Sequence, residues 1–286
     1  TSSIGPGATN FITSCALAYV NRLPILFLPG DVFANRLPDP VLQQAENFAD
    51  ATVSANDCFR PICRYFDRIS RPEQLIQSLP KSMSILTDPA DCGPVTLSLC
   101  QDVQAEAYDY PSSLFIPKVW KIRRQVCDQN ELETVIKKIK SSKKPFIIGG
   151  HGIWWSKNED MLKQVCDEIK IPIFNVPYHQ KLLNENCKAF LGLADVHQYH
   201  PSKFAFNESD CIIMVGGRLD NQMNFGNPPL FPASSRLICV NGSHEEIEFN
   251  RAADHLLLSD PGAFFKELLE SYNRDKFCLL YTSDAA

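Results

Sequence analysis

Short apolar runs that end directly in a glycine turn restrict the fold of this chain more than any other feature. They read PILFLPG at 24–30, PFIIGG at 145–150 and CIIMVGG at 211–217. An apolar run without polar alternation is typical of a strand covered on both faces, as in a parallel sheet. Helical patterns lie between such runs, so the order is strand, turn, helix, strand. The sequence therefore predicts the α/β class, with Rossmann-like parallel sheets.

Length and a change of pattern near the middle of the chain predict two domains. The chain has 286 residues, which is enough for two domains of about 150 residues each. Residues 105–117 contain two prolines and follow neither helical nor strand periodicity, which favours a linker. We therefore expect a first domain at 1–104 and a second at 118–276. The stretch at 277–286 also lacks periodicity, and we interpret it as a non-native tail.

The same pattern of apolar runs and turns predicts the individual strands and helices. Strands are predicted at 24–28, 60–67, 94–99, 145–148, 171–176, 210–215, 236–240 and 255–258. Helices are predicted at 8–20, 131–140, 157–170 and 261–272, with another that begins at Arg71. Ser70 and Glu73 form an expected capping box for that helix, and Pro80 is expected to interrupt and kink it. Asn130 is expected to cap the helix at 131–140.

Charge and composition exclude several classes of protein. The chain has 28 basic and 33 acidic residues, a net charge of −5, whereas a nucleic-acid-binding domain carries a basic excess. No apolar run approaches the roughly 18 residues that a membrane-spanning helix needs. The eleven cysteines are odd in number and lie mostly in apolar runs, which favours reduced, buried thiols over disulfides or a metal site. We predict a cytoplasmic protein that binds neither nucleic acid nor membrane.

Three glycine-containing turns are candidate ligand sites. They read GPGATN at 5–10, GGHG at 149–152 and GGRLD at 216–220. Each could bring backbone amides to a phosphate at a helix N-terminus, or could simply allow a tightly packed turn. His197 and His200 could share a helical face, but no further ligand nearby completes a metal set, so a solvated or locally bonded pair is favoured.

Four aspartates lie in or next to the long polar stretch at 31–60. They are Asp31, Asp39, Asp50 and Asp57. Aspartate commonly accepts hydrogen bonds from its own backbone in turns, which favours turn formation over a catalytic cluster.

The turn at 5–10 and several other segments carry a family resemblance. TSSIGPGATN at 1–10, followed by a predicted buried helix and PILFLPG, resembles a motif of thiamine-diphosphate enzymes of the acetolactate-synthase type. GPVTL at 93–97, with DVQ at 102–104, is similar to the end of their pyrimidine-binding domain. The stretch at 209–220 is similar to part of their central domain. The resemblance implies a partial pyrimidine-binding domain followed by a central domain.

Within this family, three long stretches resemble the hydrolases that open the ring of a cyclic dione. They lie at 28–44, 56–75 and 101–111. The resemblance implies that water cleaves a carbon–carbon bond of a small cyclic dione, with thiamine diphosphate and Mg²⁺ as cofactors. It also implies a homodimer or homotetramer for the full-length enzyme.

The resemblance further implies which residues lie at the cofactor. In the family, the proline and asparagine of GPGATN line the pyrimidine ring, and the loop before the following strand lies near it. The cofactor-binding residues implied here are Gly5, Pro6, Gly7, Asn10, Phe59 and Arg60. The family's catalytic glutamate precedes this motif and its Mg²⁺ domain follows the central domain. No catalytic or metal-binding residue is therefore assigned, and we expect this chain to be a fragment that is inactive alone.

Two other functions stay open at this point. Some relatives bind FAD or ADP and carry acidic residues after the strand that corresponds to 236–240. Asn241-Gly242-Ser243 stands there instead, so FAD is not expected and the second domain is interpreted as structural. The alternatives are an acetolactate-synthase-like carboligase and a non-catalytic nucleotide-binding module that uses the glycine turns.

Overall fold

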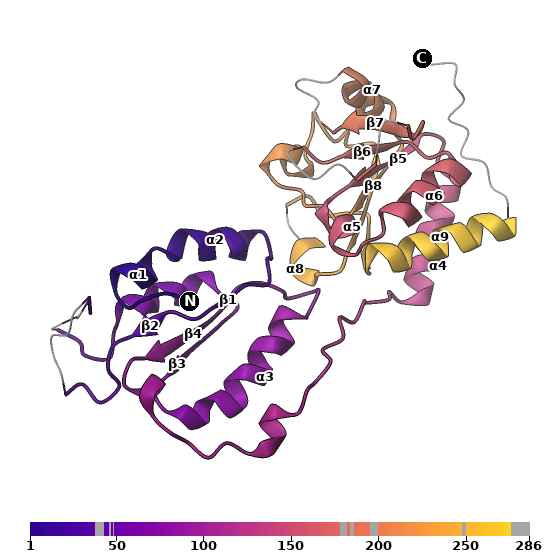
Figure 1. Cartoon of the computed structure of the whole chain (residues 1–286). Coiled ribbons are helices and arrows are strands. Elements are labelled where there is room, and N and C mark those ends of the chain that lie inside the picture. The colour runs from indigo at the N-terminus through magenta and orange to yellow at the C-terminus, as the bar shows by residue number, and fades with distance from the viewer. Residues whose placement is uncertain are drawn as a thin grey trace. The chain divides into compact units, whose positions relative to one another are not determined.

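The computed structural model describes all but short stretches of the chain. The described residues are 1–37, 43–45, 47, 49–177, 182–183, 186–194, 200–247 and 250–275. They form two units, Thr1–Arg123 and Arg124–Ala286, labelled by element in Figure 1. The division lies outside 105–117, a segment that contains the end of one 3-10 turn and one further turn, η4 (Ser112–Phe115). The role of 105–117 as a linker stays a prediction.

The first unit is built on a small parallel sheet. Its strands are β1 (Leu26–Phe27), β2 (Gly30–Asp31), β3 (Tyr65–Ile69) and β4 (Val95–Cys100). Strand β4 is central: β1 and β2 pair in succession with one edge, and β3 pairs with the other. Helices α1 (Pro6–Thr9) and α2 (Ile12–Val20) lie on one side of this sheet, and α3 (Leu75–Leu86) lies on the other (Figure 1). The predicted parallel α/β class is confirmed in this unit.

Two elements of the first unit differ from the expectation. The strand expected at 60–67 begins only at Tyr65, because residues 55–62 wind into a 3-10 helix, η1 (Ala55–Ile62). A capping box formed by Ser54 and Asp57 starts this helix. The expectation treated the residues after this polar turn as the beginning of the strand. The helix expected at 8–20 is divided, with Asn10 at the C-cap of α1.

The start and the middle of α3 also correct the expectation. The side-chain oxygen Oε1 of Gln74, rather than that of Glu73, accepts hydrogen bonds from the backbone N–H groups of Ser70 and Arg71. A 3-10 turn, η2 (Pro72–Gln74), therefore precedes α3. Helix α3 also continues through Pro80, so the expected interruption is wrong. A proline removes one backbone hydrogen bond, and packing of α3 against β3 and β4 outweighs that loss.

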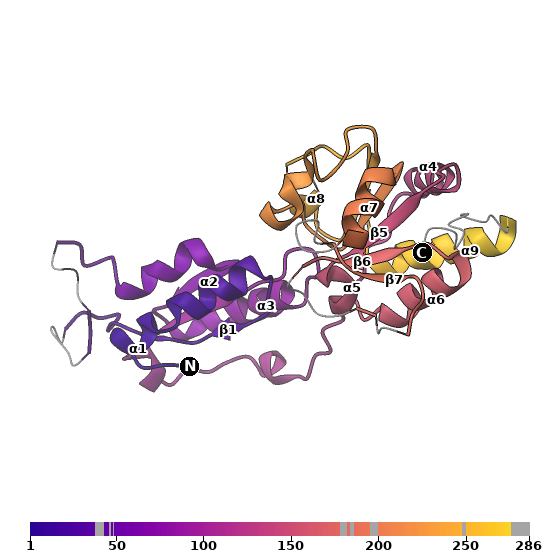
Figure 2. The same ribbon diagram turned by 90° about the horizontal axis from the view of Figure 1, so that it is seen from above.

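The second unit contains a six-stranded parallel sheet in the order β10-β9-β8-β5-β6-β7. The strands are β5 (Pro145–Gly149), β6 (Ile173–Asn175), β7 (Phe190–Leu193), β8 (Cys211–Val215), β9 (Arg236–Asn241) and β10 (His255–Leu258). The helices are α4 (Gln129–Lys140), α5 (His151–Trp155), α6 (Glu159–Ile169), α7 (His200–Glu208), α8 (His244–Ile247) and α9 (Pro261–Asp275). Figure 2 shows α7 on one face of the sheet and α5, α6 and α9 on the other. This arrangement confirms the Rossmann-like prediction.

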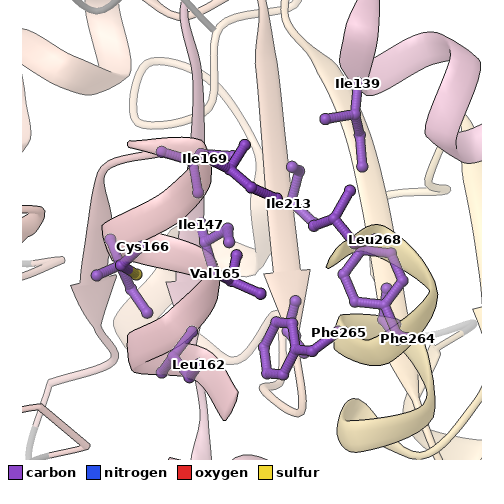
Figure 3. Close-up of a cluster of buried hydrophobic side chains, with 14 of the residues drawn as sticks. Ile139, Ile147, Leu162, Val165, Cys166, Ile169, Ile213, Phe264, Phe265 and Leu268 are labelled. Atoms are coloured by element: carbon purple, nitrogen blue, oxygen red, sulfur yellow. The ribbon is translucent and has the colours of Figure 1, made fainter. Parts of the chain in front are cut away.

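Alternate residues of the central strands enter two separate cores. Ile147 and Ile213 face the larger core, which α4, α5, α6 and α9 cover, whereas Ile148 and Ile212 face the core under α7. Figure 3 shows the larger core, where side chains of α6 and α9 meet over the strands. Since these strands are buried on both faces, their sequence shows no polar alternation.

Two short elements of the second unit were not predicted from the sequence pattern. Strand β7 is half-buried or exposed along its length, and α5 has only five residues, so neither has a clear period. Asp128, rather than Asn130, caps α4: its carboxylate accepts from the N–H groups of Asn130 and Glu131. The helix therefore begins two residues earlier than expected.

The cysteines within the described ranges are buried or half-buried, except for the exposed Cys58. Every cysteine within the described ranges is a free thiol. Burial raises the pKa of Cys15, Cys100 and Cys239 to about 12 each, so these thiols stay protonated and unreactive near neutral pH. Among the helices of the described residues, none combines the length and the apolar character that crossing a bilayer requires.

Candidate functional site

The glycine turn at 5–7 is fixed by contacts within the chain. Gly5 has φ +59°, and a Cβ atom at this position would lie 1.7 Å from the carbonyl oxygen of Gln43. The hydroxyl of Ser3 donates to Oε1 of the same glutamine at 2.8 Å. Gly7 is also close-packed, since a Cβ there would lie 3.0 Å from the Cβ of Ser3. The turn therefore holds the start of α1 against residue 43.

Pro6 and Asn10 share one face of the helical turn that follows. They are four residues apart, and the backbone N–H of Asn10 donates to the carbonyl of Pro6 at 3.3 Å. Residues with this spacing are neighbours on a helix surface. Both are exposed, and the Asn10 carboxamide has no hydrogen-bond partner among the described residues. Together they offer an apolar ring beside one free donor and one free acceptor, which suits the face and edge of a flat heteroaromatic ring.

Phe59 lies in the core of the first unit and presents no surface to a ligand. It is fully buried in a cluster with Cys15 and Phe27, and its ring centroid is 6.1 Å from that of Phe27. The side chain of Phe59 therefore has a packing role, and the placement of its loop near the cofactor stays a prediction. Phe59 anchors η1, which packs against both α1 and α2.

Arg60, the next residue, is exposed and held in place. Its Nε donates to Oδ1 of Asp57 at 2.6 Å, and its guanidinium carbon lies 4.2 Å from the centroid of the Phe66 ring. An arginine fixed by a carboxylate and an aromatic ring loses less side-chain entropy when it binds a ligand.

Behind Arg60 lies a chain of alternating charges that the sequence did not reveal. Nε of Arg68 donates to Oδ2 of Asp31 at 2.7 Å, and its Nη2 donates to Oδ2 of Asp57 at 2.9 Å. The hydroxyl of Ser98 on β4 donates to the same oxygen of Asp31 at 2.6 Å. Turn formation alone therefore does not explain Asp31, which the sequence favoured as a turn residue.

Hydrogen bonding sets the ionisation of this network. Partial burial acts to raise the pKa of Asp57, but hydrogen bonds from Arg60, the backbone of Ser54 and Arg68 outweigh it and hold the pKa below its usual value. Partial burial acts to lower the pKa of Arg68, and its bonds to Asp31 and Asp57 reverse the direction. Asp57 and Arg68 are therefore charged at neutral pH.

The two glycine turns of the second unit meet at the point where the strand order reverses. Strand β5 leads to β6 on one side, whereas β8 leads to β9 on the other, and this switch point is where α/β sheets usually bind ligands. Here, however, the N–H groups of Gly150 and Gly152 donate to the carbonyls of Val215 and Gly216, both at 2.9 Å. Amides used in this way are not available to a phosphate, which favours tight packing over ligand contact.

We predict that Gly150→Ala destabilises the second unit by about 1–3 kcal/mol, because overpacking forces the backbone to move. A Cβ at Gly150 would lie 2.3 Å from the Cα of Gly217 and 2.4 Å from the carbonyl oxygen of Gly216. Gly242→Ala is the matched control, since a Cβ there meets nothing within 4 Å. Thermal unfolding followed by circular dichroism compares the two. Equal midpoints for both variants would contradict the packing argument.

The third glycine turn and the residues after β9 also bond within the protein. Arg218 makes two hydrogen bonds to Glu246, at 2.6 and 2.8 Å. The side chain of Asn241 donates to the carbonyl of Gly217 at 3.2 Å. Asn241 stands where nucleotide-binding relatives were expected to carry an acidic residue. Its side chain stabilises the glycine turn.

The remaining sequence candidates add no site. Asp50 bonds the backbone and hydroxyl of Thr52, as expected for a turn. Asp39, His197 and the tail at 277–286 lie outside the described residues, as does the side chain of His200. In the part of the chain that the structure describes, no group of three or more His, Cys, Asp or Glu side chains could hold a metal ion.

Comparison with known proteins gives a family match and close relatives. Residues 132–268 match the family model described as thiamine pyrophosphate enzyme, central domain. The chain is 38% identical to the 3D-(3,5/4)-trihydroxycyclohexane-1,2-dione hydrolase of Clostridium perfringens over 254 residues, and these residues make up 89% of this chain. It is 39% identical over 243 residues, or 85% of its length, to the enzyme of the same name from Geobacillus thermodenitrificans. The chain spans 38% of the length of each of these curated relatives.

Solved structures show a similar fold at low identity. Benzoylformate decarboxylase from Polynucleobacter necessarius has a TM-score of 0.74 and 19% identity, with 94% of this chain and 48% of that chain covered. A thiamine diphosphate-dependent 4-hydroxybenzoylformate decarboxylase from Rhodococcus jostii has a TM-score of 0.77 and 16% identity, with 94% and 49% covered. These likenesses concern the fold alone.

Proposed function

We propose that this chain, whose residues 132–268 match the central domain of thiamine pyrophosphate enzymes, is part of a hydrolase that opens the ring of 3D-(3,5/4)-trihydroxycyclohexane-1,2-dione. The observation that carries this proposal is the 38% identity to hydrolases of that name over 254 residues. That match covers 89% of the chain and so extends well beyond the central-domain match at 132–268.

Pro6 and Asn10 fit the aminopyrimidine part of thiamine diphosphate. When bound, this cofactor supplies a carbon nucleophile and an electron sink for breaking a bond next to a carbonyl. The exposed Pro6 ring offers an apolar contact to the face of the pyrimidine, and the free carboxamide of Asn10 offers a donor and an acceptor to its edge. Gly5 and Gly7 hold these two side chains in place through the turn. We also propose that the whole enzyme binds Mg²⁺, and we assign none of its ligands to the described residues.

The proposed reaction is a hydrolysis that balances with one water. Cleavage of the bond between the two carbonyl carbons places hydrogen on one carbon, which becomes an aldehyde. The other carbon receives hydroxyl and becomes a carboxylic acid, which ionises at neutral pH. The product is 5-deoxy-glucuronate, and the step belongs to inositol degradation. We further propose a cytoplasmic enzyme that acts as a homodimer or homotetramer.

A hybrid enzyme tests the proposal. Residues 1–275 of this chain replace the matching segment of the Clostridium perfringens hydrolase, and ring opening of the dione is measured with thiamine diphosphate and Mg²⁺. Turnover of the dione is expected, and formation of acetolactate from pyruvate is not. A hybrid that unfolds cooperatively and binds the cofactor, yet forms acetolactate instead of opening the ring, would support the carboligase alternative.

In this hybrid, we predict that Asn10→Ala weakens thiamine diphosphate binding about tenfold, since a lost hydrogen bond contributes about 1–1.5 kcal/mol. The dissociation constant is measured by calorimetric titration. Asn21→Ala is the matched control, because Asn21 is also exposed and its amide donates to the carbonyl of Leu17 at the end of α2. Equal dissociation constants for wild type and Asn10→Ala would remove Asn10 from the cofactor site.

A further inference from the structure

Arg60 combines a fixed position with an open binding edge. A guanidinium has two edges that can grip a carboxylate, one that includes Nε and one formed by Nη1 and Nη2. Asp57 occupies Nε at 2.6 Å, and the Phe66 ring covers one face. Neither Nη atom has a hydrogen-bond partner within the described residues. With 54% of the side chain exposed, the Nη1–Nη2 edge is open to solvent.

The charge of Arg60 is only partly neutralised by Asp57. The carboxylate of Asp57 is shared between two guanidinium groups, since its Oδ2 also accepts from Nη2 of Arg68 at 2.9 Å. The same Oδ2 accepts from the backbone N–H of Ser54 at 2.7 Å. Asp57 therefore works as a fixed clamp, and Arg60 keeps positive charge for an anion.

The position of Arg60 in the fold relates it to the proposed cofactor residues. Arg60 lies on η1, and η1 packs directly against α1, which carries Pro6 at its start and Asn10 at its end. Phe59, the neighbour of Arg60, anchors η1 in the core. A ligand held beside the exposed face of α1 is therefore close to the element that presents Arg60.

We propose that the Nη1–Nη2 edge of Arg60 binds the carboxylate that ring opening creates, with Asp57 as its positioning residue. This rests on the proposed function, because hydrolysis of the dione converts one carbonyl carbon into a carboxylate. The planar fork of arginine matches the two oxygens of a carboxylate, whereas the neutral dione has no such group. Arg60 thus distinguishes product from substrate.

Titration of the full chain with sodium D-glucuronate tests this inference, since this sugar acid carries a similar carboxylate. The Nε–Hε resonance of Arg60 in ¹⁵N NMR spectra is expected to shift and saturate, and neutral D-glucose is expected to leave it unchanged. Arg60→Gln identifies the resonance by its loss. Isothermal titration calorimetry measures the affinity of this variant and of wild type for D-glucuronate, and Arg60→Gln is expected to bind about tenfold or more weakly. Asp57→Asn retains the arginine and is expected to weaken binding several-fold, because the clamp is lost.

Matched variants separate a specific site from general charge. Arg71→Gln removes an exposed arginine paired with Glu73 in the same unit and is expected to leave binding unchanged. Arg60→Lys keeps the charge and loses the fork, so intermediate affinity is expected. The inference is overturned if D-glucuronate fails to move the Arg60 resonance, or if Arg60→Gln binds as tightly as wild type while it unfolds at the same temperature.

The outcomes also separate this inference from the proposed function. If the hybrid enzyme opens the dione but Arg60 does not respond to D-glucuronate, the assignment of Arg60 is wrong and the hydrolase function stands. If Arg60 binds the sugar acid but the hybrid does not open the dione, the anion site stands and its link to dione hydrolysis is wrong.

Discussion

Replacement of Arg68 by methionine is expected to destabilise the first unit by about 3–5 kcal/mol, because it leaves a buried carboxylate without its partner. Asp31 is only 2% exposed, and Nε of Arg68 is 2.7 Å from its Oδ2. Asp57 would lose one of its two guanidinium partners in the same change. Hydrogen exchange of the β3 and β4 amides measures the loss, since these strands form the centre of the unit.

The control for Arg68 is an exposed arginine of the same unit with a weak ion pair. Arg71 is 75% exposed and lies 3.3 Å from Glu73, so Arg71→Met is expected to change stability by less than about 1 kcal/mol. The double variant Asp31→Asn with Arg68→Met should lose less than the sum of the two single changes, because neither charge remains unpaired. Additive losses would contradict a direct Asp31–Arg68 interaction.

This network shows which part of the candidate site the sequence could not predict. Asp31 and Arg68 are 37 residues apart. They meet because β2 and β3 pair with opposite edges of β4, and the hydroxyl of Ser98 on β4 donates to Asp31. The stretches at 28–44 and 56–75 carry a family resemblance, but nothing in them marks these two residues as partners. Their partnership depends on strand order, which local patterns do not determine.

The candidate cofactor residues came from the family resemblance and not from local sequence patterns. The resemblance assigned Pro6 and Asn10 of GPGATN to the pyrimidine ring, and the structure places both residues exposed on one face of α1. The loop of Phe59 was expected near the cofactor, and the structure adds that the Phe59 side chain is buried in a cluster with Cys15 and Phe27. Residue type alone favours a buried phenylalanine and an exposed arginine at these two positions.

The elements that were predicted correctly are those whose residues are mostly buried. The runs that became β5, β8 and β9 are apolar at nearly every position because both faces are covered, and all three were predicted. The edge strand β7 and the short helices α5 and α8 have few buried positions, so no period marked them. The start of α4 shifted by two residues because two candidate capping side chains, Asp128 and Asn130, lie close together there.

The second large effect is expected in the core of the other unit, where Phe264→Ala should lower the free energy of unfolding by about 3–5 kcal/mol. Phe264 is fully buried on α9, among side chains of α6 and the central strands (Figure 3). The adjacent ring of Phe265, at a centroid distance of 5.7 Å, belongs to the same helix and cannot fill the cavity without moving α9. Alanine favours helix formation, so the loss reports packing alone.

Phe204→Ala supplies the matched comparison for Phe264→Ala, since Phe204 lies on α7 of the same unit with 53% of its surface exposed. Its replacement should change stability by less than about 0.5 kcal/mol. Urea unfolding followed by the fluorescence of Trp154 and Trp155 reports on this unit, because both lie on α5, which packs against α9. If both variants unfolded at the same urea concentration, α9 would not be the cover of the larger core, and the buried strands β5 and β8 would need another explanation for their uninterrupted apolar sequence.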